Sequence, residues 1–314
     1  MLQNSFLSLA QQKKLRCERF LEEMEKIIPW GSFCDAVQPF YMEKETGRKR
    51  MELMTMLKIY FLQQWYSLSD PAAEEAIYDR NSFQKFLGID LLSHRVPDET
   101  TILNFRHLLE EHEMQKRFFA AVNELLESKG LLMREGTIVD ATIIAAPSST
   151  KNKEQKRDPE MSSTKKGNQW YFGMKAHIGS DTKSGVVHHL ETTAAKTNDR
   201  VPMKQLLHGK EKAIFGDKGY YKQEDKRAAR AEGILWAVSD RGTRNHPLSS
   251  SQRKRNRKFS SVRSKVEHPF RVVKCQWGFA KVRYKGLFKN TMQLFVLFSL
   301  ANLFRVRRSL LAVT

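Results

Sequence analysis

The chain of 314 residues is poor in cysteine and in negative charge, and both shortages limit what the protein can be. Its three cysteines are scattered and form no CxxC pair, which argues against a thiolate zinc site and against a disulfide framework. Acidic residues number 35 against 54 Lys and Arg, so the net charge is +19. An excess of this size favours a polyanionic partner, and nucleic acid fits best; a membrane-surface binder is the alternative.

Long hydrophobic runs are also missing. The most apolar stretch, residues 292–304, is far shorter than the ~20 residues that span a bilayer, so we expect a core helix there. The N-terminal segment MLQNSFLSLAQQKK lacks the basic start, apolar run and cleavage site of a signal peptide. Together with the unpaired cysteines, these features predict a cytoplasmic protein that does not enter the membrane.

The first third of the chain has apolar residues at helical spacing. We expect helices over residues 9–28, 51–66 and 99–112. Asp70 before Pro71, and Asp98 after Pro97, are typical of helix N-caps. Short helices and tight turns in a basic protein permit a DNA-binding helix-turn-helix, although a plain helical bundle gives the same pattern. We assign residues 1–130 to an all-helical, DNA-binding domain.

The character of the sequence changes near residue 130. The run GTIVDATIIAA is β-branched and apolar, as in a buried strand, and two alternating runs around the turn DTKSG predict a β-hairpin. Further along we expect a strand at 212–215, a helix at 223–232 and a strand at 234–238. The polar residues 147–169 are expected to form a mobile loop. This order predicts a second domain over 131–314, an α/β domain with a mixed sheet and C-terminal helices.

Two aspartates occupy conspicuous positions in that domain. Asp140 lies within a predicted buried strand, where a carboxylate is costly unless it meets a cation. Asp217 follows a short strand and is flanked by glycines, at the kind of strand end where ligands of α/β sheets gather. Taken singly, each residue also fits a plain turn or strand-end aspartate.

A third acid, Glu267, lies in a predicted helix. Arg263, Glu267, Arg271 and Lys274 are spaced to form one polar stripe on it. An exposed charged face with internal ion pairs is the simple alternative. Pro269 either kinks this helix or marks its start, and a start there would remove Arg263 from the common face.

Asp140, Asp217 and Glu267 together indicate metal-dependent phosphoryl chemistry. Such chemistry uses hard oxygen ligands around ions about 3.5–4 Å apart, and carboxylates on two strands and a helix can converge in this way. We predict that these three acids are both the metal ligands and the catalytic residues.

Several motifs resemble those of the DDE transposases of bacterial insertion sequences. They are Asp140 in its strand, the segment GDKGY with Asp217, and the pattern Arg263-x3-Glu267-x6-Lys274. The segments FLQQWYSLSDPAAEEAIYD, PDETTILNFRHLLE and VEHPFRVVKCQWGFAKVRYKGL are similar to the IS-five group in particular. The family pattern has a tyrosine three residues before the arginine, where this chain has Ser260.

The resemblance implies an RNase H-like catalytic domain that uses Mg²⁺, for which Mn²⁺ can substitute. It implies cut-and-paste transposition on double-stranded DNA, with the terminal inverted repeats and a target DNA as partners and at least a homodimer joining two ends. The residues expected to contact DNA are basic: Arg253, Lys254, Arg255, Arg263, Arg271 and Lys274. A metal-dependent nuclease without strand transfer remains an alternative; a DNA-binding protein that lost its chemistry would have lost an acid, and none is lost.

Overall fold

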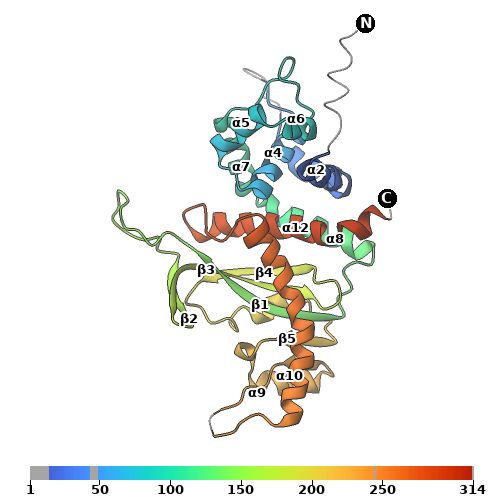
Figure 1. Ribbon diagram of the computed structural model, residues 1–314, viewed down its shortest axis with the longest axis vertical. Helices are drawn as coiled ribbons and strands as arrows, with labels where there is room; N and C mark the ends of the chain where they lie inside the picture. Colours follow the sequence, from blue (N-terminus) through green and yellow to red (C-terminus); the bar gives the residue numbers. More distant parts are fainter. Residues whose placement is uncertain (1–13, 43–48, 244, 313–314) are drawn as a thin grey trace. The chain divides into compact units, whose positions relative to one another are not determined.

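Figure 1 shows the computed structural model, which describes residues 14–42, 49–243 and 245–312. The chain divides into two compact units. The first, here called the helical unit, comprises Met1–Glu111 with Val306–Thr314, and the second, the sheet unit, comprises His112–Arg305. The division into domains predicted at residue 130 stays a prediction.

The described part of the helical unit is built from helices. They are α2 (Arg16–Ile27), α3 (Trp30–Val37), η1 (Gln38–Phe40), α4 (Leu53–Tyr66), α5 (Asp70–Asp79), α6 (Asn81–Leu87) and α7 (Glu99–Glu111). Buried residues occur on all sides of α4, among them Leu57 and Phe61, so α4 forms the centre of this unit's core. Residues 9–13 of the first predicted helix lie outside the described residues.

The two predicted N-caps have different outcomes. Asp98 caps α7 as predicted, because its Oδ1 accepts a hydrogen bond from the backbone N–H of Thr101 at 2.7 Å. The cap predicted at Asp70 is wrong by one position, since the Oγ of Ser69 accepts from the N–H of Ala72. Asp70 instead binds the buried guanidinium of Arg106 at 3.0 Å.

The sheet unit contains a six-stranded mixed sheet. Its strands are β1 (Gly136–Ala145), β2 (Ser162–Lys166), β3 (Gln169–Asp181), β4 (Val187–Ala194), β5 (Ala213–Gly216) and β6 (Leu235–Val238). The order is β2-β3-β1-β5-β6, and β4 also pairs with β3. β1 is antiparallel to β3 and parallel to β5, and β5 is parallel to β6. This is the mixed, RNase H-like arrangement that the resemblance implies, so the predicted fold class is confirmed.

The polar segment expected to be a mobile loop contains a strand. β2 pairs with the start of β3 from Ser162 opposite Gly173 to Lys166 opposite Gln169. β2 lies at the edge of the sheet and keeps no side chain fully buried. Backbone hydrogen bonds rather than apolar burial therefore hold it, and its composition alone gave no sign of a strand.

Helices surround this sheet. They are α8 (Met114–Ser128), η2 (Met203–Leu206), η3 (Lys218–Tyr220), α9 (Gln223–Ala231), α10 (Ser250–Arg263), η4 (Ser264–Val266), α11 (Glu267–Arg271), the π-helical turn η5 (Val272–Gln276) and α12 (Leu287–Leu311), whose end from Val306 belongs to the helical unit. Successive side chains of a strand point to opposite faces. On one face of β1, Val139 packs into a buried cluster with Tyr220 and Val238. On the other face, Asp140 and Thr142 meet the helical stretch from α10 to η5.

That helical stretch resolves the question raised by Pro269. The chain is helical without a break from Ser250 to Gln276, but the 3₁₀ turn η4 interrupts the α-helical hydrogen bonds, and α11 begins at Glu267. Pro269 therefore lies in the first turn of α11, where a missing N–H costs little. The helical stretch does not start at Pro269, and Arg263 and Glu267 stay on a common face with their side chains 3.8 Å apart.

Candidate active site

Asp140 lies in the middle of β1, on the face that the α10–η5 stretch covers. Its Oδ1 accepts a hydrogen bond from the backbone N–H of Ala141 at 2.8 Å, and its Oδ2 accepts one from Nη1 of Arg263 at 3.0 Å. Its side chain is only 19% exposed. The strand thus presents a largely buried carboxylate to the helical stretch.

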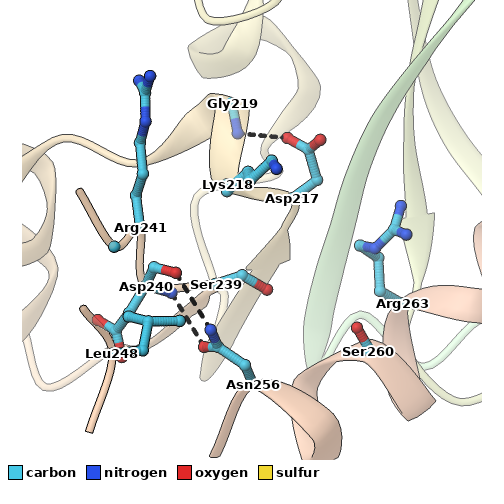
Figure 2. Close-up of a pocket in the computed structure, with 11 residues that line it drawn as sticks. Asp217, Lys218, Gly219, Ser239, Asp240, Arg241, Leu248, Asn256, Ser260 and Arg263 are labelled. Atoms are coloured by element: carbon cyan, nitrogen blue, oxygen red, sulfur yellow. Dashed lines mark hydrogen bonds between the residues drawn. The ribbon is translucent and has the colours of Figure 1, made fainter. Parts of the chain in front are cut away.

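Asp217 comes directly after β5, the strand next to β1. The two strands run parallel, with Ile138 opposite Phe215. Two residues further along each strand, this register brings Asp140 and Asp217 beside each other. Asp217 also caps the turn η3, because its Oδ1 accepts a hydrogen bond from the N–H of Gly219 at 2.6 Å (Figure 2).

Glycine at position 219 leaves room for this carboxylate. A Cβ atom on Gly219 would lie 2.8 Å from the same Oδ1 of Asp217, closer than real Cβ contacts allow. The GDKGY segment therefore sets both the place and the direction of the Asp217 carboxylate.

The electrostatics of Asp140 are dominated by burial. The pKa of its carboxyl is raised from the usual 3.8 to about 6, chiefly by burial and to a smaller extent by the negative charges of Asp217 and Asp199. The Ala141 N–H and the guanidinium of Arg263 act in the opposite direction and only partly compensate. A cation bound beside these carboxylates would relieve the repulsion.

Glu267 is the most accessible of the three acids. It begins α11 and its side chain is 67% exposed. Arg263 links it to the sheet, because Nη2 of Arg263 lies 3.8 Å from Oε1 of Glu267 while Nη1 binds Asp140. One guanidinium thus lies between two of the predicted metal ligands.

The other basic residues of the stripe lie further along the same stretch. The Nζ of Lys274 donates to the Oγ1 of Thr142 at 3.2 Å and to the carbonyl oxygen of Ile143 at 2.9 Å, so this lysine is fixed on β1 near Asp140. Arg271 is exposed. Arg271 and Lys274 line, together with Glu267, an open hollow of about 520 Å³.

The basic run of α10 is exposed, but its members differ. Arg253 and Lys254 are exposed, and their side chains form no hydrogen bond or ion pair with the described residues. Arg255 forms an ion pair with the buried carboxylate of Asp240, which Lys226 also approaches at 3.3 Å. Arg255 therefore holds the loop after β6, and its contact with DNA stays a prediction.

Sequence reasoning missed two residues beside the acids. The carboxylate of Asp199 forms an ion pair with Lys175 at 2.8 Å and acts on the pKa of Asp140. The buried Tyr220 lies beneath the site, and burial and the charges of Asp140, Asp199 and Asp217 raise the pKa of its hydroxyl. No sequence signal distinguishes Asp199 from an ordinary loop aspartate.

His177 is a buried histidine of β3. Its Nε2 lies 2.8 Å from the Oγ1 of Thr193, and burial lowers its pKa to about 4. It is therefore neutral at physiological pH and is not one of the site's charges.

The donor atoms of the candidate site fit a hard divalent cation. Carboxylate oxygens are the ligands that Mg²⁺ prefers, and Asp140 and Asp217 bring two carboxylates together on adjoining strands. Among the described residues, however, no three His, Cys, Asp or Glu side chains already lie close enough to hold one ion. The guanidinium of Arg263 contacts Oδ2 of Asp140 and so competes with a cation for this carboxylate.

Two family models match the chain. Residues 132–303 match the transposase DDE domain, and residues 9–108 match a second model, described as a transposase domain (DUF772). Because the first match covers more than half of the sequence, the chain belongs to the DDE-domain transposases. It is accordingly a protein of DNA transposition that binds DNA, and a polynucleotidyl transferase or endonuclease by class. In the part of the chain that the structure describes, no helix is long and apolar enough to cross a membrane.

Proposed function

We propose that this transposase cuts DNA at the ends of an insertion element and joins those ends to a target by a cut-and-paste route. The observation that supports this best is the parallel register of β1 and β5, which brings Asp140 beside Asp217. The link through Arg263 adds Glu267 to the same place. The quoted sequence motifs favour a member of the IS-five group, which would work on bacterial chromosomal DNA in the cytoplasm.

In this proposal Asp140, Asp217 and Glu267 hold divalent metal ions, Mg²⁺ or Mn²⁺. When bound, the ions supply Lewis-acid stabilisation of the charge that develops on the reacting phosphate. The protein's own contribution is to orient the three carboxylates. Arg263, once displaced from Asp140, becomes free to bind a phosphate oxygen, and Arg271 and Lys274 hold the backbone nearby.

The proposed reaction has two steps in one site. Water attacks a phosphorus atom at the end of the element, the P–O3′ bond breaks, and a 3′-hydroxyl is released. That hydroxyl then attacks a phosphorus atom of the target, a new P–O bond forms, and the target's own 3′-oxygen leaves. No covalent enzyme intermediate is needed, and joining two ends at once requires at least two protomers.

The test is cleavage of labelled DNA that carries the element's ends, with Mg²⁺ and with chelator. Nicking at the boundary that needs the metal, followed by joining to a second DNA, is the expected result. Metal-dependent nicking without joining would instead identify a nuclease. Binding without cleavage, in Mg²⁺ and in Mn²⁺, would contradict the proposal and leave a DNA-binding protein.

A further inference from the structure

A cleft opens beside Asp217 and is separate from the hollow at Glu267. Its volume is about 860 Å³, and its walls come from η3, from the loop after β6 and from α10 (Figure 2). Asp217 and Arg263 belong to its lining, so the cleft begins at the candidate active site. Ser260, at the position of the family's tyrosine, also lines it and leaves it wider than a tyrosine would.

Two cations in this cleft are available to a ligand. Lys218 in η3 and Arg241 in the loop after β6 both line the cleft and are exposed. Neither side chain forms a hydrogen bond or ion pair with another of the described residues. Their charges are therefore not used by the fold itself.

The one further carboxylate in the lining is already neutralised. Asp240 is buried, and its two oxygens bind Lys226 and Arg255. Asn256 holds the same residue through its backbone, accepting from the N–H at 3.0 Å and donating to the carbonyl oxygen at 3.1 Å. These bonds fix the start of the loop that carries Arg241, so this wall of the cleft is held in place by the sheet unit itself.

The cleft also has an apolar wall. Leu248 is half-buried in it, and Gly242 lies so close that an added Cβ would meet Leu248 Cγ at 3.2 Å. A cleft lined by cations and by an aliphatic side chain suits a ligand that is part phosphate and part sugar or base. Its volume lies within the ~300–1,000 Å³ typical of sites that take ligands of this size.

The order of residues along the α10–η5 stretch gives the direction of the ligand. Ser260 and Arg263 line the cleft, Glu267 comes one helical turn later, and Arg271 and Lys274 line the other hollow. A strand whose phosphate lies at the three acids would pass from the hollow on one side into the cleft on the other.

We propose that the cleft holds the nucleotide next to the scissile phosphate, with Lys218 and Arg241 as positioning residues that bind its phosphate and Leu248 packed against its sugar or base. This inference rests on the proposed function, because it takes the acids as the place of cleavage. It adds a subsite with named contacts on the side of the acids away from Lys274.

The test combines two variants with neutral phosphates. DNA carrying the element's ends is made with a single methylphosphonate at successive positions around the cleavage site, and its affinity is measured for the wild type, Lys218→Gln and Arg241→Gln. Lys129→Gln is the matched control, since it removes the same charge from the exposed C-cap of α8 outside the cleft.

On unmodified DNA each cleft variant is expected to bind about tenfold more weakly than the wild type, as for the loss of a charged hydrogen bond. The slope of log affinity against log salt should fall by about one. One methylphosphonate beside the scissile phosphate should weaken DNA binding by the wild type and leave the affinity of the cleft variants unchanged. Melting temperatures should equal that of the wild type.

The inference is overturned if the cleft variants bind unmodified DNA as tightly as Lys129→Gln does. It is also overturned if every methylphosphonate weakens DNA binding by the cleft variants as much as it weakens binding by the wild type. These readouts are affinities, so they do not depend on turnover. If the wild type failed to cleave with any metal, the proposed function would fail, and the affinity pattern would still decide whether the cleft binds a nucleotide.

Discussion

Replacing Asp140 by asparagine is expected to stabilise the metal-free protein while it abolishes cleavage. Burial raises the pKa of this carboxyl from 3.8 to about 6, so at neutral pH the ionised group opposes folding. At ~1.36 kcal/mol per pKa unit the penalty has a ceiling of about 3 kcal/mol. Asparagine has only one acceptor oxygen, so one of the two hydrogen bonds that the carboxylate accepts is lost. This loss offsets part of the relieved penalty, and we expect the free energy of unfolding to rise by about 1–2 kcal/mol.

The assay is thermal unfolding with chelator at pH 7.5. For a unit of this size each kcal/mol corresponds to ~2–4 °C, so Asp140→Asn should melt roughly 3–6 °C above the wild type. The sign with pH follows from the raised pKa. The penalty is absent below the unfolded pKa near 3.8 and complete above about 6, so the advantage of the variant should shrink as the pH falls through this window.

Glu124→Gln is the matched control, because Glu124 is exposed on α8 in the same unit. This variant should change the melting temperature little at either pH. The reasoning is refuted if Asp140→Asn is no more stable than the wild type at pH 7.5 in chelator. It is also refuted if a stabilisation persists unchanged at pH 4, since the effect would then not come from ionisation.

Three further predictions concern the same unit. Gly219→Ala should slow cleavage by roughly tenfold or more, because its Cβ would push the Oδ1 of Asp217 from a distance of 2.8 Å, and single-turnover rates would show it. Burial lowers the pKa values of His188 and His208, so the free energy of unfolding should fall as the pH drops below about 6.5, less steeply in His208→Gln; urea titrations at pH 7.5 and 5.5 measure this. Arg263→Gln should raise Mn²⁺ affinity in the absence of DNA by about two- to fivefold, by titration calorimetry, because its guanidinium no longer competes for the acids.

Gly31→Ala is a control for the first of these, since a Cβ on this α3 glycine would meet nothing within 4 Å. Equal cleavage by the two alanine variants would show that the Asp217 cap does not matter. Stability that is flat between pH 7.5 and 5.5 would contradict the histidine account. Unchanged or weaker Mn²⁺ binding by Arg263→Gln would show that the arginine supports the site rather than competing for it.

Local patterns were sufficient to predict most elements of the sheet unit. The β-branched run around Asp140 and the alternating hairpin correspond to β1, β3 and β4. Such patterns record side-chain burial, and they fail where burial does not hold an element. The edge strand β2 is held by backbone pairing to β3, so its polar sequence suggested only a loop.

The candidate site needed information that no local pattern contains. The sequence suggested that Asp140 and Asp217 each lie on or after a strand, but only the parallel pairing of β1 with β5 makes them neighbours. Asp199 joins the site's electrostatics through chain folding after β4. The spacing of four residues predicted that Arg263 and Glu267 share a face, but the ion pair of Arg263 with Asp140 depends on the packing of α10 against β1, which no local pattern records.

The most direct test of the central claim compares the wild type with Asp140→Ala on labelled DNA that carries the element's ends. Cleavage in Mg²⁺ and binding in chelator are measured on the same two preparations. If the three acids form the catalytic site, the variant binds the ends nearly as well as the wild type and does not cut them. Cleavage by Asp140→Ala at the normal rate would contradict the assignment.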